Sequence, residues 1–378
     1  MRTRMISQRM ILKMVVVVAT VGTTLCSNST AQTAQLSIKP QITNAKVEAR
    51  EVKARLAQEV DAWAAAADKA QWLGYSVAAV AGDHHMCCGS NGGDWNGGRA
   101  CGPCQLEGWH GGNDYNLQSG DVKLEGPSNV VILFRAEGRK IGKIRAVSED
   151  CILDAGGLQI TWLTGAKPGE SVKLLERFVD GKELDERGGE RLSHGALMAI
   201  AMHGDASADQ AMAAFTTPDK PESLRKEAAF WAGEARGPQG VQLLTRMAKE
   251  DASSDVRAHV AFALSISKEN NALEEMIRMA HEDTSGHVRG QALFWLAQKA
   301  GKKASGAITG AIENDPDAEV KKKAVFALSQ MPKDDGVPKL IQVAQNNKNP
   351  EVRKQAMFWL GQSNDPRALE FFEKVLGK

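Results

Sequence analysis

The residues best able to do chemistry gather in one glycine-rich stretch, residues 84–110. Thiolates and imidazoles can form disulfides, bind soft metal ions or exchange electrons with other thiols. The stretch contains His84, His85, Cys87, Cys88, Cys101, Cys104 and His110. Three interpretations therefore compete for it.

Structural disulfides are the first interpretation. A loop so rich in glycine has few apolar side chains to bury, so crosslinks would have to hold it in an exported protein. The disulfide candidates are Cys87, Cys88, Cys101, Cys104 and Cys151. Because this number is odd, one thiol is left over or bonds to another chain, and the pairing stays open.

A metal site is the second interpretation. The C-x-x-C spacing of Cys101 and Cys104 lets two thiolates reach one zinc ion, and His85, Cys87 or Cys88 could complete a tetrahedral set. The stretch lacks a second C-x-x-C pair, and an oxidising compartment favours disulfides. We therefore expect no metal and no other cofactor.

Thiol redox catalysis is the third interpretation, because Cys101-Gly102-Pro103-Cys104 is also the active-site tetrapeptide of thioredoxin. That activity needs the first cysteine at a helix N-terminus, which lowers the pKa of its thiol. Glycines lie on both sides of the tetrapeptide, so no helix is predicted there. The motifs G-x-S-x-G, H-E-x-x-H and G-x-x-x-x-G-K-S/T are absent. The sequence thus predicts no catalytic residue and no enzyme.

Residues 1–31 are typical of a signal peptide. Four basic residues accompany a short apolar run at 14–21: Arg2, Arg4, Arg9 and Lys13. Losing them takes the formal net charge from +1 to −3, so no basic field remains to hold nucleic acid. The apolar run is too short to span a bilayer. We expect a periplasmic or secreted protein without an integral membrane segment after signal cleavage.

Two segments follow before the helical half of the chain. Residues 32–70 are predicted to be a linker and an amphipathic helix over 46–70, since Val52, Leu56, Val60 and Trp63 share one helical face. Residues 71–166 are predicted to form a small antiparallel β domain that contains the cysteine loop. Its strands are expected over 72–77, 130–135 and 141–147, with hairpin turns at 137–140 and 154–157.

The helical half repeats every 32 residues. This step separates Phe230, Phe262, Phe294, Phe326 and Phe358. A period of this size indicates stacked helical hairpins. Residues that cap helices keep the same step, namely Ser253, Ser285, Asp317 and Asn349. Before them, a first helix is expected over 168–179 with Ser171 as a possible cap, and His194 and His203 are expected to face solvent or cap helices.

Charged and aromatic residues also recur. Arg225, Arg257, Arg289, Lys321 and Arg353 keep the 32-residue step, as do Asp219, Asp251, Asp283, Asp315 and Asn347. We favour a hydrogen-bonded ladder between neighbouring turns over a charged binding stripe, because charges present in every repeat usually serve stacking. Tryptophans follow alternate phenylalanines, at Trp231, Trp295 and Trp359. We interpret them as core residues in preference to a row that binds a peptide or glycan.

The repeat resembles the HEAT family, in particular the short HEAT-like repeats of phycobilin lyases. The resemblance rests on Asp255-Val256-Arg257 through Ala263-Leu264, and on Glu319-Val320-Lys321 through Ala327-Leu328. The resemblance covers about residues 190–378 and implies an α-solenoid that binds other macromolecules. We expect an α+β chain, in which an N-terminal helix and the small antiparallel β domain precede an α-solenoid of about six hairpins over 167–378. We expect a non-catalytic scaffold with an unknown protein partner. The alternatives are a metal or thiol-redox protein using loop 84–110, and a glycan or cell-wall binder using Trp95 and Trp109.

Overall fold

The computed structural model describes residues 40–82, 84, 86, 104–107, 128–179 and 186–377. The predicted signal peptide and Cys87, Cys88 and Cys101 lie outside these residues. The described residues belong to one compact unit, Lys39–Lys378. Within them, no helix has both the length and the apolar character needed to cross a membrane.

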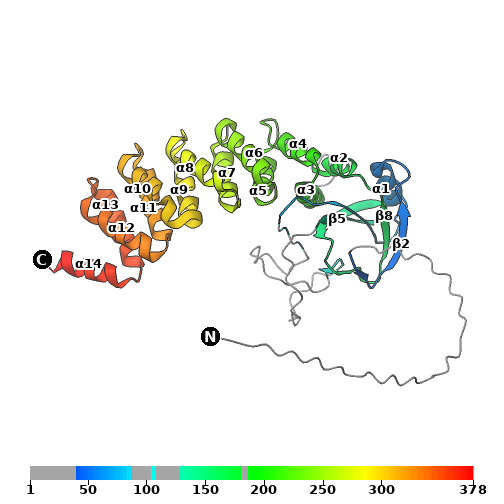
Figure 1. Cartoon of the computed structure of the whole chain (residues 1–378), viewed down its shortest axis with the longest axis horizontal. Helices are drawn as coiled ribbons and strands as arrows, with labels where there is room; N and C mark the ends of the chain where they lie inside the picture. The colour runs from blue at the N-terminus through cyan, green and yellow to red at the C-terminus, as the bar shows by residue number, and fades with distance from the viewer. Residues whose placement is uncertain are drawn as a thin grey trace, which may run out of the picture. The chain divides into compact units, whose positions relative to one another are not determined.

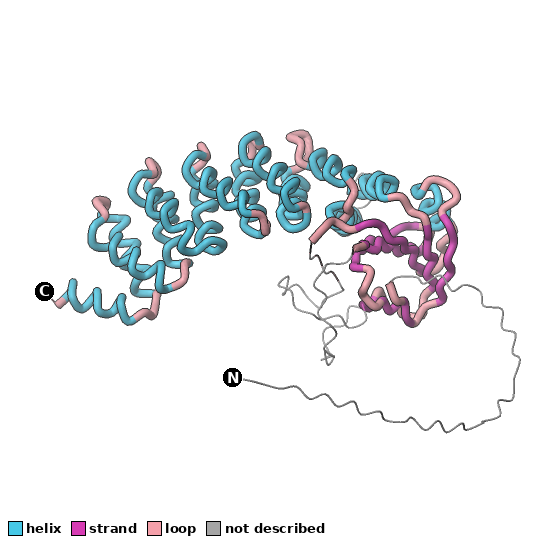
Figure 2. Tube along the Cα trace, in the orientation of Figure 1, coloured by secondary structure: helices cyan, strands magenta, loops and turns pink. Residues whose placement is uncertain are grey.

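A five-stranded sheet forms the first half of this unit (Figure 2). Its strands, in spatial order, are β2 (Lys46–Glu51), β8 (Gln159–Thr164), β3 (Gln71–Ala78), β5 (Asn129–Glu137) and β6 (Lys140–Ser148). The predicted hairpin at 137–140 joins β5 to β6, and β3 is antiparallel to β5. However, β8 is parallel to both β2 and β3. The sheet is therefore mixed where the sequence predicted an antiparallel one, because β8 inserts between two earlier strands.

Residues 46–51 form strand β2, not the first part of a helix. The helix α1 spans only Leu56–Ala65, and Leu56, Val60 and Trp63 are buried as predicted. The strand pairs with β8 over its whole length, and all six of its residues are solvent-exposed. Its mixed charges suit an exposed edge strand as well as an exposed helix face, so the sequence alone did not separate the two.

The turn at 154–157 does not make the predicted hairpin. It connects β8 to β7 (Leu153–Asp154), which lies in a second, three-stranded sheet with β1 (Ile42–Thr43) and β4 (Cys104–Gln105). Gly156 and Gly157 have positive φ, as the turn requires. The tight turn thus redirects the chain from one sheet to another.

Six helical hairpins form the second half (Figure 1). In each hairpin we call the earlier helix the first helix and the later one the second helix. The pairs are α3 (Glu186–Ala201) with α4 (Ala206–Phe215), α5 (Glu222–Ala235) with α6 (Gly237–Glu250), α7 (Ser254–Ile266) with α8 (Asn270–Glu282), α9 (Gly286–Ala300) with α10 (Ser305–Asn314), α11 (Ala318–Gln330) with α12 (Lys333–Asn346), and α13 (Pro350–Gln362) with α14 (Pro366–Leu376). The predicted α-solenoid of about six hairpins is confirmed.

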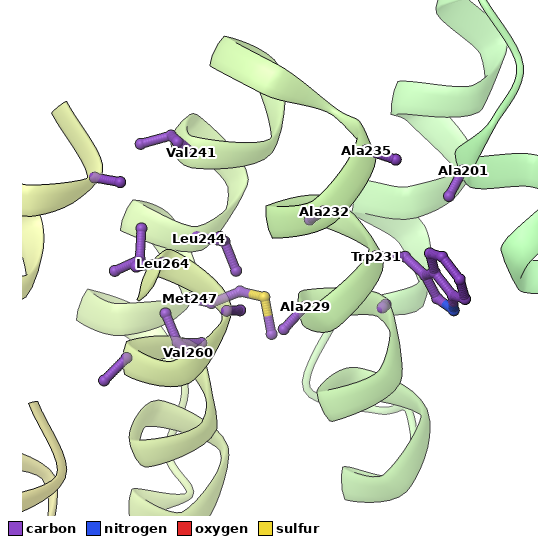
Figure 3. Packing of buried hydrophobic residues seen from close by; sticks show 14 of the residues in the cluster. Ala201, Ala229, Trp231, Ala232, Ala235, Val241, Leu244, Met247, Val260 and Leu264 are labelled. Carbon is purple, nitrogen blue, oxygen red and sulfur yellow. The ribbon is translucent and has the colours of Figure 1, made fainter. Parts of the chain in front are cut away.

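Caps and small residues explain this regularity. The side chains of Ser253, Asp317 and Asn349 accept the predicted N-terminal hydrogen bonds, whereas Ser285 starts its helix without one. The two helices of a hairpin also approach closely at a small residue. That position holds Gly240, Ala272, Ala304, Gly336 and Ala368. Figure 3 shows buried side chains of α5 and α6 at this packing, among them Ala232 of α5 and Leu244 of α6.

The sheet and the hairpins share backbone hydrogen bonds. Ala79, just after β3, forms a β-bridge with His203, just after α3. The Val80 N–H donates to the Met202 carbonyl at 2.8 Å. Helix α3 also packs on β6, and a Cβ on Gly195 of α3 would lie 2.5 Å from the Ile144 carbonyl oxygen. The first hairpin is therefore covered by the sheet.

A buried chain of three polar side chains fixes this junction. The Ser171 hydroxyl of α2 (Pro168–Val179) lies 2.8 Å from the Tyr75 hydroxyl and 2.8 Å from His203 Nε2. Ser171 and His203 are fully buried. Ser171 therefore does not cap α2. His203 does not face solvent, but its Nδ1 lies 2.7 Å from the Ala199 carbonyl in the last turn of α3, so the expected capping role is confirmed. Its Nε2 bonds to Ser171, a tertiary contact that the sequence did not reveal.

Candidate functional site: an aromatic row on the first helices

The repeating phenylalanines and tryptophans form one continuous set of ring contacts across five hairpins. We call this set the aromatic row. It consists of Phe230, Trp231, Phe262, Phe294, Trp295, Phe326, Phe358 and Trp359. Phe230 stacks on Phe262 with ring centroids 6.2 Å apart, and Phe294 stacks on Phe326 at 5.8 Å. The 32-residue step produces the row, because it places each ring at the same position on successive first helices.

The tryptophans link the stacked pairs. Trp295 lies 4.7 Å from Phe262, and Trp359 lies 4.8 Å from Phe326. Trp295 and Trp359 thus each pack on the phenylalanine of the preceding hairpin. In that hairpin the next residue is a small alanine, Ala263 or Ala327. This alternation of large and small residues keeps the row continuous.

Exposure differs along the row. Trp231 is 1% exposed, so the prediction that it is core is confirmed, and in Figure 3 it points away from α6. Trp295 and Trp359 are half-buried, as are the four phenylalanines from Phe230 to Phe326. Phe358 is 53% exposed. The core interpretation therefore holds fully for Trp231, whereas Trp295 and Trp359 are buried only in part and remain partly accessible at the surface.

An open hollow of about 390 Å³ lies on this row. Its lining consists of Lys226, Asp255, Ala258, His259, Phe262, His287, Gln291 and Trp295. These residues come from α5, α7 and α9. The hollow has two aromatic rings and an alanine as its apolar part, while charged and polar side chains surround them. No serine, threonine or cysteine is among these lining residues.

The repeat varies at one position of this lining. The position four residues before each phenylalanine holds Lys226, Ala258, Gly290, Lys322 and Lys354. Lys226 and Ala258 line the hollow, whereas Gly290 is buried against the Lys323 side chain. The hollow depends on how three neighbouring first helices pack, and the sequence analysis did not predict it.

Two histidines give the hollow its electrostatic character. The ring of His259 lies 5.4 Å from that of Phe262, and burial, followed by the nearby Lys226 ammonium, lowers the pKa of His259. The imidazole is therefore neutral at pH 7. Nε2 of His287 lies 3.7 Å from the Asp255 carboxylate. The hollow thus presents a cation, an anion and a neutral ring around an apolar floor.

The predicted charge ladder is structural. In three successive hairpins the arginine of the first helix binds the aspartate that ends the second helix, with an Nε–Oδ2 distance of 2.8 Å each time. These pairs are Arg225–Asp251, Arg257–Asp283 and Arg289–Asp315. The members of each pair are buried or nearly so. A ligand could not reach them, so a charged binding stripe at these positions is wrong.

Two of the five disulfide candidates are among the described residues. Cys104 in β4 and Cys151 are both about 1% exposed, and neither carries a free thiol. The pairing of the five cysteines stays a prediction, because the other three lie outside the described residues. In the part of the chain that the structure describes, no three histidine, cysteine or acidic side chains gather as metal ligands would. The zinc and redox interpretations of loop 84–110 are untested by this result.

The folding pattern defines a class of protein, an α-solenoid preceded by a small mixed sheet. Residues 208–297 and 307–378 match the family of HEAT repeats. This part of the chain therefore consists of HEAT repeats, and the predicted resemblance is confirmed. No curated protein matches the sequence.

Several solved structures resemble part of the chain. Human deoxyhypusine hydroxylase is 15% identical, with 55% of this chain and 90% of that chain covered and a TM-score of 0.29. The CpcE–CpcF complex of phycocyanin lyase from Nostoc sp. PCC7120 is 20% identical, with coverages of 41% and 99% and a TM-score of 0.32. A condensin subcomplex from S. pombe is 18% identical, with coverages of 52% and 28% and a TM-score of 0.33. None of these likenesses bears on function.

Proposed function

We propose that this protein is an exported, non-catalytic scaffold that binds a partner protein through its aromatic row. One observation carries the proposal: half-buried rings run without interruption over five hairpins and end at the 53% exposed Phe358. Rigid aromatic side chains contribute large contact areas at little entropic cost, and they dominate many protein interfaces. Rings needed only for the core would not have to reach the surface.

The hollow supports a protein partner over nucleic acid. Its apolar floor with a mixed polar rim matches the anatomy of a protein–protein interface. Nucleic acid would require a positive face, whereas Lys226 shares this hollow with Asp255, and the rest of the chain is close to neutral. Export rests on the features of residues 1–31.

The test is affinity capture from the native extracellular or periplasmic fraction, using residues 32–378 purified after export. Captured proteins are then remade pure, and their binding to variants is measured. Phe262→Ala and Phe358→Ser should each weaken binding at least about tenfold, since central aromatic anchors contribute more than 1 kcal/mol. Gln242→Ala and Lys249→Ala, exposed on the second helix α6, are the matched controls and should leave binding unchanged.

A partner that binds all four variants equally would refute the proposed surface. Circular dichroism and the melting temperature check that Phe262→Ala is folded, and Phe358 is exposed enough that its serine variant should fold normally. The non-catalytic part has its own test. Turnover of a thiol or disulfide substrate that is lost in Cys101→Ser would contradict it, and stoichiometric zinc in the exported protein would favour the metal alternative.

A further inference from the structure

The outer edge of strand β2 is uncovered in the part of the chain that the structure describes. β2 is the last strand of the five-stranded sheet, and among the described strands it pairs with β8 alone. All six of its residues are solvent-exposed, whereas β6 at the opposite edge of the sheet packs on α3. The open edge of a strand presents unpaired N–H and C=O groups, which are a template for one further strand.

The pairing with β8 decides which backbone groups of β2 face outward. The N–H groups of Lys46 and Val52 donate to carbonyl groups at or next to the two ends of β8. Successive residues of a strand turn their N–H and C=O groups to opposite sides, so the even-numbered residues of β2 bond to β8. The backbone groups of Val47, Ala49 and Glu51 therefore point away from the sheet.

Charged side chains limit what can pair with this edge. Lys46, Glu48 and Arg50 share one face of the strand, in the order positive, negative, positive. Glu48 lies 3.3 Å from the Gln159 amide and Arg50 lies 3.9 Å from the Glu59 carboxylate, yet both side chains remain exposed. Charges on an edge oppose an apolar strand, and like charges placed directly opposite destabilise a pair of strands. A partner strand must therefore bring opposite charges to Glu48 and Arg50.

We propose that β2 pairs antiparallel with β2 of a second copy of this protein, about a two-fold axis at Ala49. Ala49 then lies opposite the partner's Ala49, and Val47 lies opposite the partner's Glu51. Each of these pairs can exchange two N–H···O bonds, because the backbone groups of all three residues face outward. Glu48 lies opposite the partner's Arg50 at a position without hydrogen bonds, where cross-strand side chains are closest. Two-fold symmetry forms this ion pair twice.

Other registers of the same two strands fail. A shift by one residue places outward-facing backbone groups opposite groups that already bond to β8. A shift by two residues in one direction places Glu48 opposite the partner's Glu48, and in the other direction Arg50 opposite the partner's Arg50. The edge is thus complementary to itself in one register, as an isologous contact requires. This contact is independent of the proposed function, because the aromatic row lies on the first helices of the hairpins.

Sedimentation velocity of the exported protein over about a hundredfold range of concentration tests the pairing. The mass should rise reversibly from that of one chain to that of two. Ala49→Pro removes an outward N–H without removing a bond to β8, and edge strands accept proline at such positions. It should weaken the dimer at least about tenfold, because two N–H···O bonds are lost. Ala49→Thr keeps the N–H and suits a strand, so it is the matched control and should dimerise normally. Circular dichroism and the melting temperature check that both variants are folded.

A charge exchange tests the register itself. Glu48→Arg and Arg50→Glu should each weaken the dimer by roughly fivefold, because two exposed ion pairs become two repulsions. An equimolar mixture of these two variants should form a mixed dimer about as tight as that of the wild type, since opposite charges then face each other at both pairs. The proposal fails if the protein stays monomeric at every concentration, if Ala49→Pro dimerises like the wild type, or if the mixed dimer is no tighter than those of the single variants.

Discussion

One arginine in each inner hairpin bonds to the ends of two second helices at once. In α7, Nε and Nη2 of Arg257 donate to the Asp283 carboxylate at 2.8 and 3.0 Å, while Nη1 donates to the Asp251 carbonyl at 2.8 Å. Asp283 in turn accepts the N–H of Ser285. The guanidinium thus joins the ends of two successive second helices, and it places a cation where their carbonyl groups are exposed.

The fourth position of the ladder is Lys321, which has no aspartate partner in the ladder and can be compared with Arg289. Arg289→Met leaves the buried carboxylate of Asp315 without its partner, and should lower the free energy of unfolding by about 3–5 kcal/mol. Lys321→Met is the control, since the Lys321 ammonium donates to the Glu313 carbonyl and the ladder residue beyond it is the neutral Asn347. Its effect should stay within about 1 kcal/mol. Urea denaturation measures both, and equal losses would contradict the structural role of the ladder.

His203 predicts a dependence of stability on pH. Burial, and then the charge of Arg236, lower its pKa to about 4, whereas an unfolded histidine titrates near 6.5. Since the folded pKa is the lower one, the unfolded state gains the proton first as the pH falls. The stability contributed by neutral His203 is complete above about pH 6.5 and declines toward pH 4, by about 3 kcal/mol in total.

Urea unfolding of wild type and His203→Gln between pH 7 and pH 4.5 isolates this residue, because other groups titrate in both proteins. The difference in unfolding free energy should shrink as the pH falls. Gln242→Ala, at an exposed position on α6 and without a titratable group, is the control and should show a difference that does not vary with pH. A constant difference for His203→Gln as well would show that burial does not hold this imidazole neutral.

At the scale of elements, the repeat was predictable and its exceptions were not. Helices α7, α9, α11 and α13 each begin one residue after the cap read from the sequence, because every hairpin has the same neighbours. The strand at 46–51 was missed because alternating charges suit an edge strand and an exposed helix equally well. Ser171 and His203 meet only through tertiary packing. The hollow depends on side chains of three helices, α5, α7 and α9, that only tertiary packing brings together.

Helix spacing within a hairpin gives a matched pair of glycine substitutions. A Cβ on Gly240 of α6 would lie 1.9 Å from the Ala232 carbonyl oxygen of α5, so Gly240→Ala must push the two helices apart. We expect it to cost about 1–3 kcal/mol of unfolding free energy. Gly306, in α10, has open space around its Cβ position, so Gly306→Ala should be neutral or stabilise by up to about 1 kcal/mol.

Thermal and urea denaturation measure the stability of both alanine variants. Gly240→Ala should lower the free energy of unfolding, whereas Gly306→Ala should leave it unchanged or raise it. The alanines found at the equivalent positions of other hairpins, Ala272 and Ala304, show that the site can accept a Cβ when the helices are set for it. If Gly240→Ala were as stable as wild type, the spacing between α5 and α6 could adjust without cost, and Gly240 would not be what sets their close approach.

At the scale of the whole molecule, the hairpins depend on one another differently from the way the sheet and the first hairpin do. Hairpins contact mainly their neighbours, so a local change in the array should spread little. The sheet, however, is joined to the first hairpins by the chain of Tyr75, Ser171 and His203. A change at this junction should therefore lower the local stability of both the sheet and the first hairpin.

Ser171→Ala tests this difference by hydrogen exchange with mass spectrometry. The substitution leaves the Tyr75 hydroxyl and His203 Nε2 buried without the group that joins them, which should cost about 1–3 kcal/mol. Exchange should accelerate by roughly 5- to 150-fold in β3 and at the end of α3 together, as that loss requires. Ser265→Ala is the control, because the Ser265 hydroxyl bonds only to the Phe262 carbonyl within its own helix. Acceleration confined to β3, or equal in the two variants, would mean that the sheet and the hairpins fold independently.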